Sequence, residues 1–204
     1  MNLAIILVTC SVAYTSAYIE NGNDKKCEIF LPLIDLLKDH FQVVAMEVDG
    51  FVLGTHTRFT SVDDQARKVI EYINKNHGGS ICCAYGLSLG GKILSRVLER
   101  DEVKIEHSIL DECKKVYPFG GTRAVLDGYK SVYTTELKYI PEGLDIHYWH
   151  GTQESFVAKP QAKHLKSLCP DVKVEVFKKM NHGQLLIDYP EEIAKRIIIY
   201  GEED

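Results

Sequence analysis

Residues 81–91 read ICCAYGLSLGG, an apolar run that ends in a serine set among glycines. The apolar run predicts a buried strand, and residues 92–98 continue with the spacing of an amphipathic helix. Gly86, Ser88 and Gly90 fit the pattern G-x-S-x-G, which is typical of a nucleophile elbow when a strand precedes it and a helix follows it. Small residues there let the two backbones approach, and the strained turn projects the Ser88 hydroxyl above the sheet edge. The alternative is an ordinary turn serine.

Strands and helices alternate along the rest of the chain. We predict strands over residues 3–8, 42–48, 81–85, 105–110, 144–149 and 172–177, and helices over 29–38, 61–76, 89–100, 160–168 and 190–200. Alternation of this kind predicts an α/β fold, with a mostly parallel six-stranded sheet and helices on both faces.

The helix predicted over residues 61–76 has the clearest end signals. Ser61 and Asp64 fit a shortened capping box, with aspartate in place of the usual glutamate, and Gly78 is a natural stop.

The 204 residues suit one domain spanning 1–204. Residues 112–140 are the least regular part, and we predict a short cap or lid there rather than a second domain. The aromatic residues of this segment, together with Phe51, either line an apolar pocket or pack the cap onto the body.

Composition excludes some classes of partner. The formal net charge is −5, so the chain lacks the basic footprint of a nucleic-acid-binding protein. No apolar run is long enough to span a membrane. Residues 3–8 follow no positive charge, which favours a core strand over a signal peptide and predicts a cytoplasmic location.

The six cysteines lack metal-ligand spacing and are expected to be buried thiols in a reducing compartment.

Three polar residues follow predicted strands in the order serine, acid, histidine. Ser88, Glu154 and His182 should therefore lie at the same edge of a parallel sheet. Asp111, which ends the strand 105–110, is the alternative acid. His150 is a rival base, but its place beside a glycine at a strand end favours a role in ordering that turn.

One further histidine stays open. His56 lies in a loop that is able to approach the site.

The chain resembles a small member of the α/β-hydrolase superfamily. The resemblance covers nearly the whole chain and is most specific at GLSLGG (86–91), VDGF (48–51), HGTQE (150–154) and NHG (181–183). It implies a serine-acid-histidine triad that acts without cofactor or metal on a small acyl substrate. The first two strands of larger members are missing here.

By position, Ser88 is the expected nucleophile, Glu154 the acid and His182 the base. His182 would take the proton of Ser88, and Glu154 would fix the tautomer of the imidazole. The resulting oxyanion needs two donors, and the backbone N–H of Leu89 is the first.

The segment after the first strand departs from the family pattern. Many members carry His-Gly there, whereas this chain has Thr9-Cys10-Ser11. We expect the backbone N–H of Cys10 or of Ser11 to be the second oxyanion donor.

These observations predict a serine hydrolase that cleaves a carboxylic ester or thioester through an acyl-enzyme. A peptidase or amidase uses the same triad, so it is one alternative. The missing His-Gly favours another, a non-catalytic domain of the same fold that binds a ligand or a partner.

Overall fold

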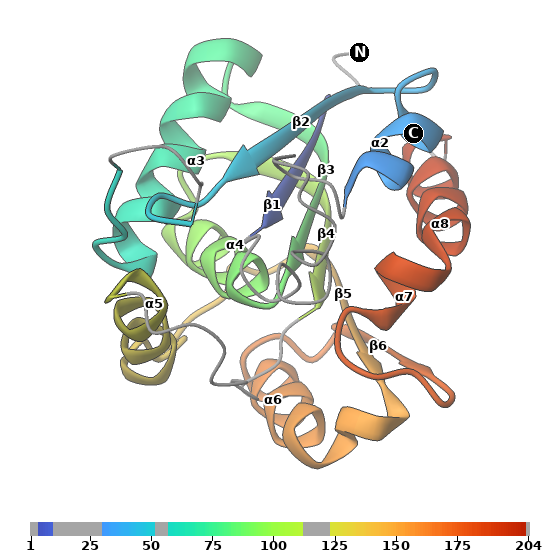
Figure 1. The fold of residues 1–204 in the computed structure, drawn as a ribbon. Helices are drawn as coiled ribbons and strands as arrows, with labels where there is room; N and C mark the ends of the chain where they lie inside the picture. The colour runs from blue at the N-terminus through green and yellow to red at the C-terminus, as the bar shows by residue number, and fades with distance from the viewer. Residues whose placement is uncertain (1–3, 10–29, 52–56, 112–122, 203–204) are drawn as a thin grey trace, which may run out of the picture.

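The computed structural model describes residues 4–9, 30–51, 57–111 and 123–202. Its centre is one six-stranded sheet of order β2-β1-β3-β4-β5-β6, in which every pairing is parallel (Figure 1). The strands are β1 (Ala4–Thr9), β2 (Gln42–Glu47), β3 (Ser80–Leu87), β4 (Lys104–Asp111), β5 (Asp145–Gly151) and β6 (Lys173–Phe177). The predicted fold class is confirmed.

Helices cover both faces of this sheet. They are α2 (Leu31–Leu37), α3 (Val62–His77), α4 (Leu89–Arg100), α5 (Arg123–Thr134), α6 (Ser155–Leu168), α7 (Gln184–Asp188) and α8 (Pro190–Glu202). One face packs against α3, α4 and α6, and the other against α2, α7 and α8 (Figure 1). Strand β1 shows why both faces are apolar: Ile6 and Val8 point into the first layer, whereas Ile5 and Leu7 point into the second.

Helix α6 begins earlier than the sequence predicted. We expected residues 160–168, with Pro160 near the start, but the helix begins at Ser155 and contains the proline. Pro160 has no N–H to donate to the carbonyl of Phe156, so one hydrogen bond of the first turns is absent. The buried face of the helix, which includes Ala158 and Leu165, packs on the core and compensates for this loss.

A polar network joins strands β4, β5 and β6 to helix α8. Asp145 Oδ2 lies 2.8 Å from His107 Nδ1 and 3.0 Å from His147 Nε2, and Asp145 Oδ1 lies 2.7 Å from Lys173 Nζ. Burial opposes ionisation of Asp145, but these three donors outweigh it and hold the pKa of Asp145 below its usual value. Tyr200 OH lies 3.1 Å from His147 Nδ1, and burial raises the pKa of Tyr200 to about 12.

The predicted buried thiols are observed where the chain is described: Cys82, Cys83 and Cys169 are buried. The other three cysteines lie outside the described residues.

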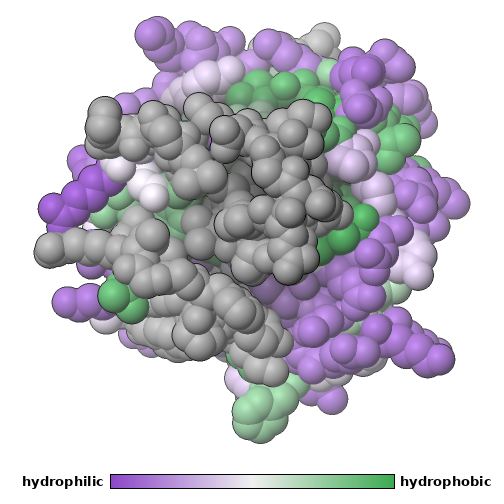
Figure 2. Space-filling view, viewed as in Figure 1, coloured by the Kyte–Doolittle hydropathy of each residue, from purple (hydrophilic) through white to green (hydrophobic). Residues whose placement is uncertain are grey.

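No helix in the described ranges is long and apolar enough to cross a membrane. On the face seen in Figure 2, hydrophilic residues dominate the described rim and apolar residues form smaller separate areas.

The ends of helix α3 are capped as the sequence predicted. Ser61 Oγ accepts the backbone N–H of Asp64 at 3.0 Å, and Gly78 closes the helix in the left-handed conformation. The hydroxyl therefore satisfies one of the N–H groups that a helix start leaves without an internal partner.

Ser61→Ala removes this acceptor and should lower the free energy of unfolding by about 1 kcal/mol. The measurement is urea unfolding followed by circular dichroism. Thr60→Ala, at the exposed neighbouring position, is the matched control and should change it by less than about 0.5 kcal/mol. Equal stability of the two variants would show that the cap contributes nothing.

Candidate active site

Ser88 occupies a backbone conformation that side-chain-bearing residues rarely adopt. It lies between β3 and α4 with φ 59° and ψ −116°. Its N–H donates to the carbonyl of Asp111 at 2.6 Å, and its own carbonyl accepts the N–H of Lys92 at 3.1 Å. The serine turn is therefore held by the end of the neighbouring strand β4 on one side and by the first turn of α4 on the other.

Gly86 allows the strand and the helix to touch at this turn. A Cβ atom on Gly86 would lie 2.6 Å from the carbonyl oxygen of Gly90 and 2.7 Å from the nitrogen of Gly91. No side chain fits in that space, so glycine is a steric requirement at the first position of the G-x-S-x-G pattern.

Glu154 and His182 form a buried pair at the same edge of the sheet. His182 Nδ1 lies 3.2 Å from Glu154 Oε2, and the two side chains are 8% and 2% exposed. Glu154 follows β5, where its other oxygen accepts the N–H of Gly151 at 2.9 Å. His182 follows β6, where its backbone N–H donates to Asn181 Oδ1 at 2.9 Å. The Glu154 side chain is thus oriented by its own turn, and the backbone of His182 is held by the neighbouring asparagine.

The two turns that carry this pair are in backbone contact. A Cβ atom on Gly151 would lie 2.0 Å from the carbonyl oxygen of Met180, and the same oxygen accepts the N–H of Gln153 at 3.1 Å. This approach places the residues after β6 beside the turn after β5, so the Glu154–His182 distance depends on the absence of a side chain at Gly151.

Asp111 is the third ionisable group at this place. It is 5% exposed, and burial raises its pKa to about 7. The charge of His182 and the hydroxyl of Tyr85, 3.5 Å away, act in the opposite direction, while Glu154 raises the pKa further. One oxygen or nitrogen atom from each of Asp111, Glu154 and His182 lies within 4.8 Å of the others, a donor set that is also able to hold a metal ion.

The backbone of Asp111 connects Ser88 to the group formed by Asp111, Glu154 and His182, because the Asp111 carbonyl accepts the Ser88 N–H. In the part of the chain that the structure describes, no hydrogen bond joins the Ser88 hydroxyl to His182. Leu89 is the first residue of α4, where backbone N–H groups are not used inside the helix, so its N–H is available at this edge.

The remaining predicted residues fall into two groups. His150 Nδ1 lies 2.9 Å from the carbonyl oxygen of Gly151 and is buried, which agrees with a role in ordering the turn. Cys10, Ser11 and His56 lie outside the described residues.

The cap predicted over residues 112–140 is described only from residue 123 onward. Its helix α5 packs on α3 and α4, and the Cβ position of Gly128 lies 3.0 Å from Phe51 and 3.7 Å from Leu89. Phe51 is buried and packs edge to face on Phe59, with 5.7 Å between the ring centroids, so it lies between the core and helix α5. Tyr139 is 56% exposed and faces solvent.

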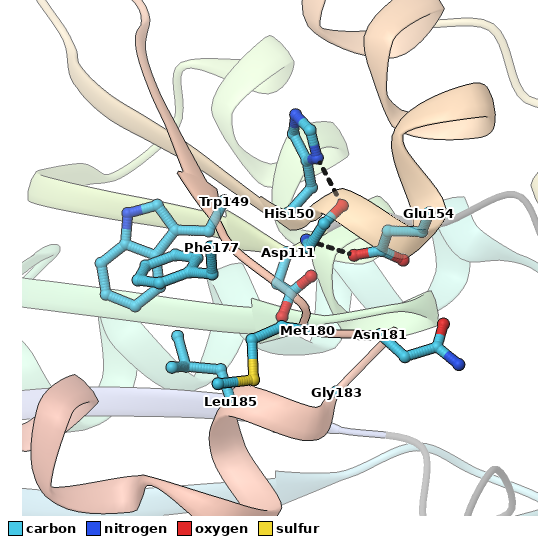
Figure 3. A pocket seen from close by; sticks show the side chains of 10 residues that line it. Asp111, Trp149, His150, Glu154, Phe177, Met180, Asn181, Gly183 and Leu185 are labelled. Atoms are coloured by element: carbon cyan, nitrogen blue, oxygen red, sulfur yellow. Dashed lines mark hydrogen bonds between the residues drawn. The ribbon is translucent and has the colours of Figure 1, made fainter.

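A small pocket lies beside the carboxyl ends of β4, β5 and β6 (Figure 3). It is lined by Asp111, Trp149, His150, Gly151, Glu154, Phe177, Met180, Asn181, Gly183 and Leu185. In Figure 3 the rings of Trp149 and Phe177 lie together on one side of Asp111, and Glu154 lies on the opposite side of Asp111. Sequence reasoning missed these two aromatic residues, although both lie at the ends of predicted strands.

Gly151→Ala should lower the free energy of unfolding by about 1–3 kcal/mol, because the new methyl group overlaps the carbonyl of Met180. Urea unfolding measures the change. Ser155→Ala, at the first residue of α6, is the control and should alter stability by less than about 0.5 kcal/mol. A Gly151→Ala protein as stable as the wild type would mean that the turn after β6 moves away at no cost.

The charge state of Asp111 should make stability depend on pH. Between pH 4 and pH 7 the folded protein holds a proton that the unfolded chain has lost, so the free energy of unfolding should fall as the pH rises through this window. At most, the effect is on the order of 4 kcal/mol.

Asp111→Asn removes this titration, so the variant should gain stability relative to the wild type between pH 4.5 and pH 8. Urea unfolding at the two pH values tests the difference, with Asp171→Asn at an exposed position as the control. A difference between variant and wild type that does not change with pH would show that Asp111 is already ionised at pH 4.5.

The comparisons with known proteins agree with this architecture. No protein-family model and no curated protein matches the chain. Among solved structures, an α/β-hydrolase family protein from Desulfitobacterium hafniense matches with a TM-score of 0.76 and 16% identity, over 96% of this chain and 94% of that one. A marine microorganism esterase matches with a TM-score of 0.71 and 14% identity, over 98% and 95%. MenH from S. aureus matches with a TM-score of 0.68 and 12% identity, over 100% and 94%. The chain therefore has the α/β-hydrolase fold, as its sequence motifs implied.

Proposed function

We propose that this protein is a serine hydrolase that cleaves a carboxylic ester or thioester through an acyl-enzyme on Ser88. One observation carries the proposal: a serine in a strained turn lies at the same sheet edge as a buried histidine–glutamate pair. A strained backbone persists only where the surrounding structure holds it, and such positions cluster at functional sites. Structural neighbours described as esterases support hydrolytic chemistry.

The proposed reaction assigns one role to each group. His182 accepts the proton of Ser88 as the serine oxygen attacks the acyl carbon, and it then donates that proton to the leaving alcohol or thiol. Water attacks the acyl-enzyme in the second half of the cycle, with His182 again as the base. Glu154 accepts the Nδ1–H of His182 and stabilises the imidazolium that forms at each proton transfer.

The amino end of α4 is the proposed oxyanion site. The N–H of Leu89 is the first donor, and the aligned peptide dipoles of this helix favour negative charge at its start. The backbone N–H of Cys10 or Ser11 is the proposed second donor. The cap over residues 112–140 is the proposed source of specificity for the acyl group.

The second candidate is a ligand-binding domain without turnover. It is favoured by the lack of a hydrogen bond between Ser88 and His182 among the described residues, and by the Thr9-Cys10-Ser11 sequence where many relatives have His-Gly. In unliganded enzymes, however, catalytic hydrogen bonds often tighten only when substrate binds. Reactivity of the serine distinguishes the two candidates.

A fluorescent fluorophosphonate should label the wild-type protein, and Ser88→Ala and His182→Ala should each abolish labelling. Ser167→Ala, at an exposed serine, is the control and should label like the wild type. EDTA should leave labelling unchanged, because the proposed chemistry needs no metal ion. A folded wild type that stays unlabelled would favour the ligand-binding candidate.

Labelling would then be followed by turnover of matched ester, thioester and amide substrates. Cleavage of the amide alone would replace the proposed esterase activity with a peptidase or amidase activity.

A further inference from the structure

Two carboxyl groups, not one, lie beside the imidazole of His182. Glu154 contacts Nδ1 at 3.2 Å, and a ligand atom of Asp111 lies within 4.8 Å of both partners. A shift of about 2 Å would bring Asp111 into hydrogen-bonding distance of the imidazole. A hydrolytic triad needs only one acid, so the second carboxyl requires an explanation.

The surroundings of Asp111 leave one of its oxygens uncommitted. Asp111 Oδ2 has a long contact of 3.5 Å with Tyr85 OH, whereas Oδ1 is buried and has no hydrogen-bond partner among the described residues. A buried carboxyl oxygen that lacks a donor is costly, so it requires an explanation, and a catalytic role is one of those known.

The charge on Asp111 is coupled to the charge on His182. Among the described residues, the titratable groups that act on this carboxyl are Tyr85 from β3, Glu154 from the turn after β5 and His182 from the turn after β6, and His150 lines the same pocket. Burial and the negative charge of Glu154 favour the neutral acid, whereas a positive charge on His182 favours the carboxylate. Asp111 is therefore most readily ionised when His182 carries the proton taken from serine.

The backbone of Asp111 links the same residue to the nucleophile. Its carbonyl accepts the N–H of Ser88 at 2.6 Å, so the backbone of Asp111 is fixed relative to the serine turn. We propose that Asp111 is a second acid of the site: a positioning residue that shares His182 with Glu154 and replaces Glu154 when that side chain is lost. This role rests on the proposed function, because it requires His182 to act as a base.

The test measures the second-order rate of fluorophosphonate labelling for Glu154→Gln, Asp111→Asn and the double variant. Loss of Glu154 alone should slow labelling by about 10- to 100-fold, far less than the roughly 10⁴-fold expected when a triad loses its only acid. Asp111→Asn alone should slow it by less than about 10-fold. The double variant should fall to the level of His182→Ala, and Glu142→Gln, at an exposed position, should match the wild type.

The outcomes separate this role from the proposed function itself. A wild type that does not label overturns both. A wild type that labels, together with a Glu154→Gln protein no faster than the double variant, overturns only the role of Asp111.

Proton NMR tests the same role of Asp111 without a substitution at Asp111. An imidazole N–H that donates to a carboxylate gives a far-downfield proton signal, which His182→Ala assigns in the wild type. The signal should persist, shifted, in Glu154→Gln, because Asp111 becomes its acceptor. Its complete loss in a folded Glu154→Gln protein overturns the proposal.

Discussion

The backbone contact between the end of β3 and the start of α4 determines where the serine turn lies at this sheet edge. The backbones of Gly86 and Gly90 are in contact, so the chain must reverse its direction between them. Ser88, which lies in this turn, adopts the strained backbone conformation. The reversal also aims the amino end of α4 at the space above the sheet. The pairing of Leu87 with Asp111 then brings the next strand to the same level. The close backbone contact thus determines where the Ser88 hydroxyl, the amino end of α4 and the carboxyl of Asp111 lie.

The site also shows how the same residue type acquires opposite properties from its neighbours. Asp145 is surrounded by two imidazoles and a lysine ammonium, so it stays ionised although it is partly buried. Asp111 is almost completely buried beside another carboxylate, and the hydrogen bond that it accepts from the described residues is a long one from a hydroxyl, so its neutral form is favoured. The two ends of the strands therefore differ in chemistry: one holds a carboxylate that is paired with three donors, and the other holds an ionisable group that is sensitive to the charge of its partner.

Much of this arrangement follows from local patterns in the chain. Runs of apolar residues predicted the six strands, and Ser61 predicted the start of α3, because those signals depend on near neighbours in sequence. The extra turns of α6 before Pro160 were not predictable in this way, because tertiary packing outweighed the usual effect of a proline.

The close grouping of Asp111 with Glu154 and His182 shows the other limit of sequence reasoning. Position after a strand predicts that all three lie at one edge, and it leaves Asp111 and Glu154 as alternative acids. Their simultaneous approach to one imidazole depends on the register of β4 with β5 and on the contact between Gly151 and Met180. Neither the strand register nor the backbone contact is encoded by a local sequence pattern. For the same reason, the sequence did not predict the pocket wall formed by Trp149 and Phe177.

The strand order has a consequence for local unfolding. Ser88 follows β3, an inner strand with neighbours on both sides, whereas His182 follows β6, which is the edge strand of the described sheet and pairs with β5. Opening of an edge strand disrupts fewer contacts than opening of a central one, so the segment around His182 should exchange its amide hydrogens faster than the segment around Ser88. Partial opening at this edge would separate the imidazole from its acids and leave the serine turn folded. The proposed nucleophile and its base thus belong to regions of different local stability.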